Sequence, residues 1–143
     1  PFMPLHPTEY AHMLGEKIKK ENVNVWLINT GWSGGAYGIG KRIKLKYTRA
    51  MIAAAMTNQL TETNYIQHDI FKLNMPVKCP EVPSELLNPI NTWKDKYTYT
   101  KNAKKLAQLF HENFKKIENV IDENSIINLK RLNEIILGGP QKK

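Results

Sequence analysis

The chain has 143 residues, 41% of them hydrophobic, which is enough for one domain with a buried core and excludes a disordered tail. Its formal net charge of +8 favours an anionic partner, either a nucleotide or a nucleic acid. The single cysteine, Cys79, excludes a disulfide within the chain and indicates a reducing compartment, for which we expect the cytoplasm. No apolar run is long enough to span a membrane, and no signal-peptide pattern is present. The sequence starts at Pro1 without an initiator Met, so we expect a longer parent protein.

The N-terminal part predicts a helix followed by a buried strand. Pro7 suits the first position of a helix, and Tyr10, Leu14 and Ile18 recur on one helical face. The apolar run Val25–Ile28 is typical of a strand that is covered on both faces. A helix next to a buried strand favours an α/β arrangement of layers over a helical bundle.

The next stretch, Asn29–Arg49, concentrates the residues suited to binding chemistry. Five glycines fall between Gly31 and Gly40, and no Asp or Glu occurs between Glu21 and Glu62. Five basic residues follow the glycines: Lys41, Arg42, Lys44, Lys46 and Arg49. Exposed amides in a glycine-rich loop, followed by cations and a helix N-terminus, form a plausible site for a phosphorylated ligand.

The segment Gly35–Arg42 nearly matches the phosphate loop of nucleoside triphosphatases. The last position of that motif requires a Ser or Thr that binds magnesium, and here it is Arg42. We therefore interpret the near-match only as a loop that suits an anion. After it we expect an extended run with Arg42, Lys44 and Lys46 on one side. Thr48 would then cap a helix over 50–56.

The second half alternates short elements with a long helix. The alternation over Phe71–Val77 predicts a half-buried strand, which Pro76 places at a sheet edge. A short helical turn is expected at Ser84–Leu87, and a long helix at Tyr97–Ile117. The apolar stripe of this long helix comprises Ala103, Leu106, Ala107, Phe110, Phe114 and Ile117. A last helix is expected to start at 122–125 and to end at 138–140, with its inward side chains at Leu129, Leu132 and Ile136.

Several motifs, spaced in order along residues 1–117, resemble those of one enzyme family, the ATP-dependent phosphoenolpyruvate carboxykinases. The central motifs are Asn29-Thr30-Gly31-Trp32, Gly40-Lys41-Arg42-Ile43 and Tyr47-Thr48-Arg49-Ala50. The flanking motifs are Leu5-His6-Pro7-Thr8-Glu9-Tyr10-Ala11, Pro83-Ser84-Glu85-Leu86-Leu87-Asn88-Pro89, Asn91-Thr92-Trp93 and Leu109-Phe110-His111-Glu112-Asn113-Phe114.

The resemblance implies an α/β fold that is the C-terminal fragment of a carboxykinase nucleotide-binding domain, with helices packed on a small mixed sheet. Residues 1–119 would belong to that domain, and residues 120–143 would form a C-terminal helix and tail. The family converts oxaloacetate and ATP to phosphoenolpyruvate, ADP and carbon dioxide with a divalent metal, Mg or Mn, in gluconeogenesis. The resemblance places the metal ligands and the true phosphate loop upstream of this chain, so the fragment alone is expected to be inactive.

By matching motif, Arg42, Ile43 and Thr48 are the expected nucleotide contacts. Arg42 would contribute charge and directed hydrogen bonds, and Ile43 would lie beside the adenine and ribose. Taken from the residues alone, Arg42 also suits an ion pair, Ile43 a core position and Thr48 a simple helix cap.

Two other functions compete with this one. A basic module that binds single-stranded nucleic acid would use the cations together with Trp26, Trp32 or Tyr37 for stacking. The chain could instead serve only as a structural or assembly unit, with an apolar surface left exposed. The four histidines show no metal-ligand spacing, and Cys79 lacks the partners of a nucleophile.

Overall fold

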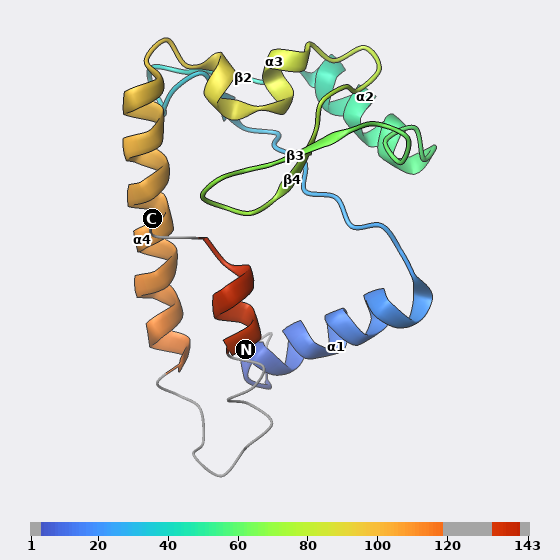
Figure 1. The fold of residues 1–143 in the computed structure, drawn as a ribbon, viewed down its shortest axis with the longest axis vertical. Helices are drawn as coiled ribbons and strands as arrows, with labels where there is room; N and C mark the ends of the chain where they lie inside the picture. The colour runs from blue at the N-terminus through green and yellow to red at the C-terminus, as the bar shows by residue number, and fades with distance from the viewer. Residues whose placement is uncertain (1–3, 119–132, 141–143) are drawn as a thin grey trace.

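A computed structural model of the chain describes residues 4–118 and 133–140 (Figure 1). Its helices and strands are, in chain order, α1 (Pro7–Glu21), β1 (Trp32–Ser33), β2 (Lys41–Arg42), α2 (Leu45–Met56), β3 (Tyr65–Gln67), β4 (Asn74–Pro76), α3 (Ser84–Leu87), the 3-10 helix η1 (Pro89–Thr92) and α4 (Lys96–Glu118). Residues 133–138 are helical as well. The predicted combination of helices and strands is confirmed. No helix in the described ranges is both long and apolar enough to cross a membrane.

Helix α1 starts where the sequence predicts. Pro7 is its first residue, and the Nδ1 atom of His6 accepts a hydrogen bond from the Thr8 backbone N–H at 3.3 Å. Asn22 ends the helix in the left-handed conformation, with φ of 48°. In Figure 1, α1 lies at the opposite end of the molecule from α2 and α3.

The prediction of a small mixed sheet is wrong for the described residues. They contain two separate antiparallel pairs, β1 with β2 and β3 with β4. Each pair is a local hairpin, which needs no partner from elsewhere in the sequence. A parallel neighbour would require a crossover connection, and no strand in the described ranges supplies one.

The predicted strand at Val25–Ile28 is also wrong in this structure. These residues have no regular structure, and Val25 is 61% and Leu27 78% exposed. The apolar run is present, but a strand requires a neighbouring backbone, and none pairs with this segment in the part of the chain that the structure describes. Only Trp26 reaches the core, where it stacks on Tyr65 with 6.3 Å between ring centroids.

Helix α2 begins earlier than predicted. Its N-cap is Lys44, so Thr48 lies inside the first turns and is not the cap. The extended run over Arg42, Lys44 and Lys46 is wrong as well, because β2 ends at Arg42. Strand β1 is only two residues long, so the pairing stops there and the backbone is free to enter the helix.

The strand predicted over Phe71–Val77 is shorter in the structure. Only Asn74–Pro76 pairs, while Lys72 lies in the turn with φ of 58°. The turn closes through the Lys72 N–H, which donates to the His68 carbonyl at 2.9 Å. Strand β4 pairs with β3 on one side, so Pro76 does lie in an edge strand of the described sheet.

Two buried clusters hold the elements together. The first joins α2 to the segment before α3 and contains Ala54, Leu60, Cys79 and Val82. The second joins the β3–β4 turn to α4 and contains Ile70, Ala103 and Ala107. The short helix at Ser84–Leu87 and the long helix are confirmed, α4 running along one side of the molecule in Figure 1.

The stripe predicted on α4 is buried only in part. Ala103 and Ala107 are buried, but Leu106 is 45% and Phe110 53% exposed. Near the C-terminus, residues 133–138 return to α4, where His111 Nε2 lies 2.6 Å from the Pro140 carbonyl oxygen. Ile136 is half-buried, in agreement with its predicted inward position, whereas Leu129 and Leu132 lie outside the described residues.

Candidate functional site

The glycine-rich stretch forms the β1–β2 hairpin. Trp32 lies opposite Arg42 and Ser33 opposite Lys41, and the Ile43 N–H donates to the Gly31 carbonyl at 2.9 Å. Backbone pairing therefore fixes the two strand ends although each strand is short. The pairing holds both ends of the glycine loop, which comprises residues 34–40.

Two glycines in this loop are required by close backbone approach. A Cβ built on Gly40 would lie 2.4 Å from the Gly35 carbonyl oxygen, which no side chain permits. Gly34 has φ of 78°, and a Cβ there would lie 3.0 Å from the Thr92 carbonyl oxygen of η1. Gly40 lets the loop close on itself, and Gly34 lets the loop pack against η1.

An aromatic pair marks the tip of the loop. Trp32 and Tyr37 meet edge to face, with 5.2 Å between ring centroids. Tyr37 is 84% and Ile39 81% exposed. The loop thus exposes apolar side chains next to the basic residues that follow it in the sequence.

Among the described residues, the basic side chains that follow the loop have no acidic partner in an ion pair. Within residues 4–118 and 133–140, the one ion pair joins Lys20 to Glu21 on α1. The first turn of α2 has no acidic residue, so its N-terminal dipole adds to the positive charge. Lys46 lies 4.9 Å from the centroid of the Tyr47 ring. These cations and the N-terminus of α2 together favour negative charge at this surface.

The three predicted nucleotide contacts are close in the sequence and lie on the segment that runs from β2 into α2. Arg42 is exposed at the end of β2, and Ile43 follows it half-buried. Thr48 lies in the first turns of α2 and is only 8% exposed. Its hydroxyl has no hydrogen-bond partner among the described residues, which is unusual for a polar group buried to this extent.

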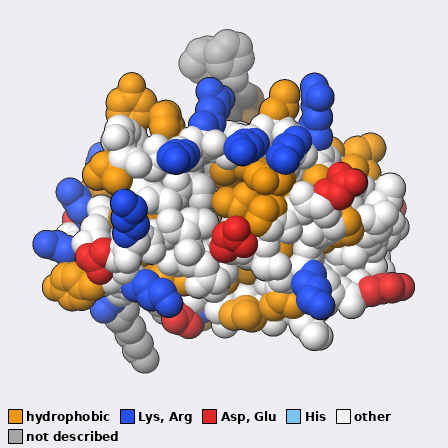
Figure 2. Space-filling model, turned by 90° about the horizontal axis from the view of Figure 1, so that it is seen from above, with side chains coloured by type: hydrophobic (Ala, Val, Ile, Leu, Met, Phe, Trp, Pro, Cys, Tyr) orange, Lys and Arg blue, Asp and Glu red, His pale blue; other side chains and the backbone are white. Residues whose placement is uncertain are grey.

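On the face that Figure 2 shows, the basic residues do not form one continuous patch. Seen from above in Figure 2, Lys and Arg side chains are spread over the face, with a short row along its upper edge and apolar side chains between them. Trp26, a candidate for base stacking, is half-buried in the core instead. This distribution does not favour a track for a nucleic-acid backbone.

A metal ion has no evident site in the described ranges. No group of three or more His, Cys, Asp or Glu side chains there is arranged to hold one. Cys79 is buried, and burial raises the pKa of its thiol, which keeps it protonated and unreactive.

One polar cluster was missed by the sequence reasoning. His68 and Tyr99 meet at 2.6 Å beside a cavity of about 310 Å³ that lies away from Arg42. They are 31 residues apart, so no local pattern connects them. A lone buried histidine without ligand spacing gives no signal that distinguishes it from a core residue.

Comparisons with known proteins show the family of the chain. The family profile described as phosphoenolpyruvate carboxykinase matches residues 1–85, which is more than half of the chain, and the chain belongs to this family. Its curated relatives are named phosphoenolpyruvate carboxykinase (ATP), which is the branch that the sequence motifs resemble.

Three relatives show the extent of the match. The protein of Christiangramia forsetii is 57% identical over 86% of this chain, that of Flavobacterium johnsoniae 60% over 82%, and that of Caldanaerobacter subterraneus 58% over 86%. The matched part is 23%, 22% and 24% of these relatives, respectively. This chain thus spans about a quarter of their length.

Proposed function

We propose that the chain is the C-terminal portion of an ATP-dependent phosphoenolpyruvate carboxykinase and forms one wall of its ATP site. The complete enzyme converts oxaloacetate and ATP to phosphoenolpyruvate, ADP and carbon dioxide in the cytoplasm. The observation that carries the proposal is the family match over residues 1–85, which includes the whole basic hairpin and α2. Residues 1–119 are the proposed domain portion and 120–143 the proposed tail.

Arg42 is the proposed cationic contact to the nucleotide. Its guanidinium is exposed and has no ion pair among the described residues, so binding an anion does not require breaking an internal contact. Guanidinium stays charged at working pH and offers several donors in a fixed plane. Hydrogen bonds between ionised groups are the strong ones, so Arg42 accounts for most of the affinity that this wall contributes.

Ile43 and Thr48 complete the wall. Ile43 is half-buried directly after Arg42, and it offers an apolar contact to the adenine and ribose. The Thr48 hydroxyl lacks a partner in the described ranges, and a ligand oxygen or nitrogen would satisfy it. The N–H groups at the start of α2 lie on the same segment and favour a negative group.

The proposed ATP site is complete only with residues from the remainder of the enzyme. The exposed apolar side chains of Val25 and Leu27 form a surface that another part of the polypeptide would cover. The divalent metal that the family implies does not fit the described residues of this chain, and we assign its ligands to the upstream part. When bound there, the metal supplies charge neutralisation at the phosphates. We therefore expect no turnover by this chain alone.

The test is phosphoenolpyruvate formation by the full-length protein, meaning the polypeptide that contains this chain and the rest of the family's length. Arg42→Ala removes charge-assisted contacts worth about 1.5–3 kcal/mol, so kcat/KM for ATP falls roughly tenfold or more. Arg42→Lys keeps the charge and recovers part of the loss. Lys17→Ala, an equal loss of charge on the exposed face of α1, leaves kcat/KM unchanged.

Each result decides a separate part of the proposal. A wild type that forms no phosphoenolpyruvate overturns the proposed function. An active wild type with an unchanged Arg42→Ala variant keeps the enzyme but removes Arg42 from the ATP site. Steeply salt-dependent oligonucleotide binding that ATP does not displace would instead support the nucleic-acid module.

A further inference from the structure

His68 occupies an unusual position at the tip of the β3–β4 hairpin. Its Nδ1 atom accepts hydrogen bonds from the backbone N–H groups of Ile70 and Phe71, both at 3.2 Å. A nitrogen that accepts two N–H groups cannot carry a proton. The imidazole is therefore neutral, and its proton is on Nε2.

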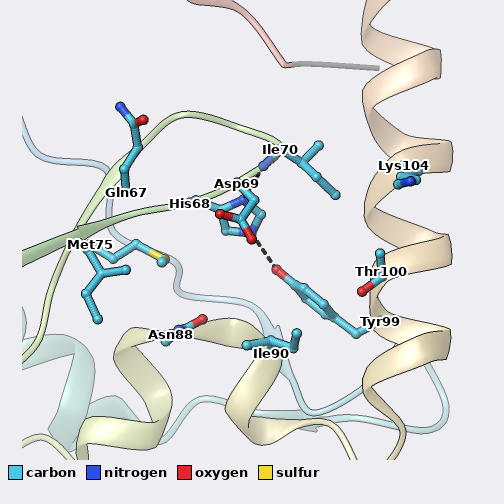
Figure 3. A pocket seen from close by; sticks show the side chains of 11 residues that line it. Gln67, His68, Asp69, Ile70, Met75, Asn88, Ile90, Tyr99, Thr100 and Lys104 are labelled. Carbon is cyan, nitrogen blue, oxygen red and sulfur yellow. Dashed lines mark hydrogen bonds between the residues drawn. The ribbon is translucent and has the colours of Figure 1, made fainter. Parts of the chain in front are cut away.

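The same ring reaches across to α4. Because Nε2 carries the proton, it donates to the Tyr99 hydroxyl at 2.6 Å. Figure 3 shows Tyr99 extending from α4 toward His68 beside the cavity. His68 is 9% exposed and Tyr99 half-buried, so little water competes for this bond. It ties the hairpin tip to α4.

Tyr99 in turn contacts the residues that support the glycine loop. Its ring meets Trp93 edge to face, with 5.6 Å between centroids. The Trp93 N–H donates to the Ile90 carbonyl of η1 at 3.4 Å. At the end of η1, the Thr92 carbonyl oxygen lies so close to Gly34 that a Cβ there would come within 3.0 Å. Each step is a direct contact between packed groups.

We propose that His68 is a positioning residue for the glycine loop, residues 34–40, of the proposed ATP site. Contacts through Tyr99, Trp93 and the Thr92 carbonyl hold this loop in the form that receives ATP. Protonation of His68 releases the loop. This inference rests on the proposed function. Protonation would place a hydrogen on Nδ1, so the two N–H groups of Ile70 and Phe71 would lose their acceptor. The hairpin tip must then move, and the ring leaves Tyr99.

The groups around the imidazole favour its neutral form. Desolvation lowers the pKa of His68 most, Lys72 lowers it further, and Asp69 opposes both. From α4, Tyr99 and Lys104 face the same cavity, and burial raises the pKa of the Tyr99 phenol, so that it stays neutral. Helix η1 has no ionisable side chain, since it comprises Pro89–Thr92.

Two substitutions break the His68–Tyr99 hydrogen bond in different ways. His68→Asn keeps an acceptor oxygen for the two backbone N–H groups but is too short to reach Tyr99. Tyr99→Phe removes the hydroxyl and keeps the ring against Trp93. His12→Asn, at a half-buried histidine on α1, is the matched control.

The experiment measures KM for ATP and kcat between pH 5.5 and 8.5 for the full-length protein and these variants. We expect wild-type KM for ATP to rise as the pH falls through the pKa of folded His68, which burial places below the ordinary histidine value of about 6.5. Both variants should show KM raised about fivefold at pH 8, with kcat nearly unchanged and the acid rise lost. The double variant should show the same KM for ATP as either single variant, because both substitutions remove the same His68–Tyr99 hydrogen bond.

The outcomes separate this inference from the proposed function. An active enzyme whose variants match His12→Asn in KM and in pH profile overturns the positioning role and leaves the carboxykinase assignment intact. Variants that lose kcat and thermal stability together, without a specific change in KM, also overturn it, because His68 would then be purely structural. A wild type that forms no phosphoenolpyruvate overturns both.

Discussion

The β1–β2 and β3–β4 hairpins differ in how they satisfy their polar groups. In β1–β2 the backbone is fully engaged at the base, while Arg42 and its basic neighbours have no intramolecular counter-charge in the described ranges. In β3–β4 the turn is closed by a side chain, with His68 bonded to two backbone N–H groups and to Tyr99. One hairpin presents its charges outward, and the other uses its polar groups within the molecule.

The difference distinguishes binding from support. A cation with no counter-charge is free to meet a ligand, whereas a polar group with three partners stabilises the fold that holds it. The two hairpins are joined by η1 and α4, through Thr92 and Tyr99. Substitutions in β1–β2 should therefore change ATP use directly, and substitutions around β3–β4 should change it indirectly, through the packing that supports the loop.

The largest expected effect is at Gly40. Its missing Cβ would lie 2.4 Å from the Gly35 carbonyl oxygen, so Gly40→Ala must open the loop and displace Arg42 on the adjoining strand. A displacement of about 1 Å at a binding site lowers turnover by roughly a hundredfold. We expect a loss of that size in kcat/KM for ATP, measured on the full-length protein.

A Gly40→Ala variant with normal ATP kinetics would break the comparison, because the β1–β2 loop would then have no part in the reaction. Circular dichroism provides the control. The loop is peripheral to both buried clusters, so the spectrum and the unfolding temperature should change little.

The second prediction concerns the support behind β3–β4. Ala107 is fully buried on α4 against Ile70 of the hairpin turn, so Ala107→Leu adds a side chain where there is no space. Overpacking of this kind costs about 1–3 kcal/mol of stability. Hydrogen exchange of the α4 amides in the full-length protein should accelerate accordingly, with a smaller change in KM for ATP.

Leu109→Ala on the same helix is the control, since Leu109 is 50% exposed. An Ala107→Leu variant with unchanged exchange but impaired ATP binding would reverse the roles that we assign to the two hairpins.

The sequence predicted the elements whose signals are local. Helix α4 and the short helix α3 follow from periodicity, and α1 follows from Pro7 at its first position. The prediction of a strand at Val25–Ile28 was wrong because a strand must pair with a neighbouring strand, and the described residues contain none for this segment. The prediction that Thr48 caps α2 was wrong because the short β1 ends the hairpin early, so α2 already begins after Lys44.

In the candidate site, too, sequence motifs pointed to some residues, whereas others became visible only in the folded structure. Arg42 and Ile43 came from motif matching and stay predictions of ATP contact, although the structure does place them on one segment with Thr48. The His68–Tyr99 bond was beyond the reach of sequence patterns, because it depends on how the hairpin packs on α4.

The third prediction is a pH dependence of stability. Because the pKa of His68 is lowered in the folded state, the unfolded chain binds more protons between that value and about 6.5. The contribution of neutral His68 is therefore fully present above about pH 6.5 and is lost as the pH falls through the folded-state pKa.

Thermal unfolding of the full-length protein at pH 8 and pH 5.5 measures this effect. The difference in unfolding temperature between the two pH values should be smaller in His68→Asn than in wild type. An identical difference in both proteins would show that other groups cause the acid sensitivity, and that His68 is not the pH-sensitive part of the β3–β4 support.

The smallest effect is expected at a glycine outside both hairpins. Gly15 lies within α1, and a Cβ there would meet no atom within 4 Å, so Gly15→Ala is sterically free. Alanine loses less backbone freedom on folding, and we expect about 0.5–1 kcal/mol of stabilisation from this change. Urea unfolding followed by the helical signal measures it, and KM for ATP should stay at the wild-type value. Gly15→Ala and Gly40→Ala add the same methyl group to one chain, so a loss of ATP use in both would show that sensitivity is general, whereas a loss in Gly40→Ala alone assigns it to the close backbone contact in the β1–β2 loop.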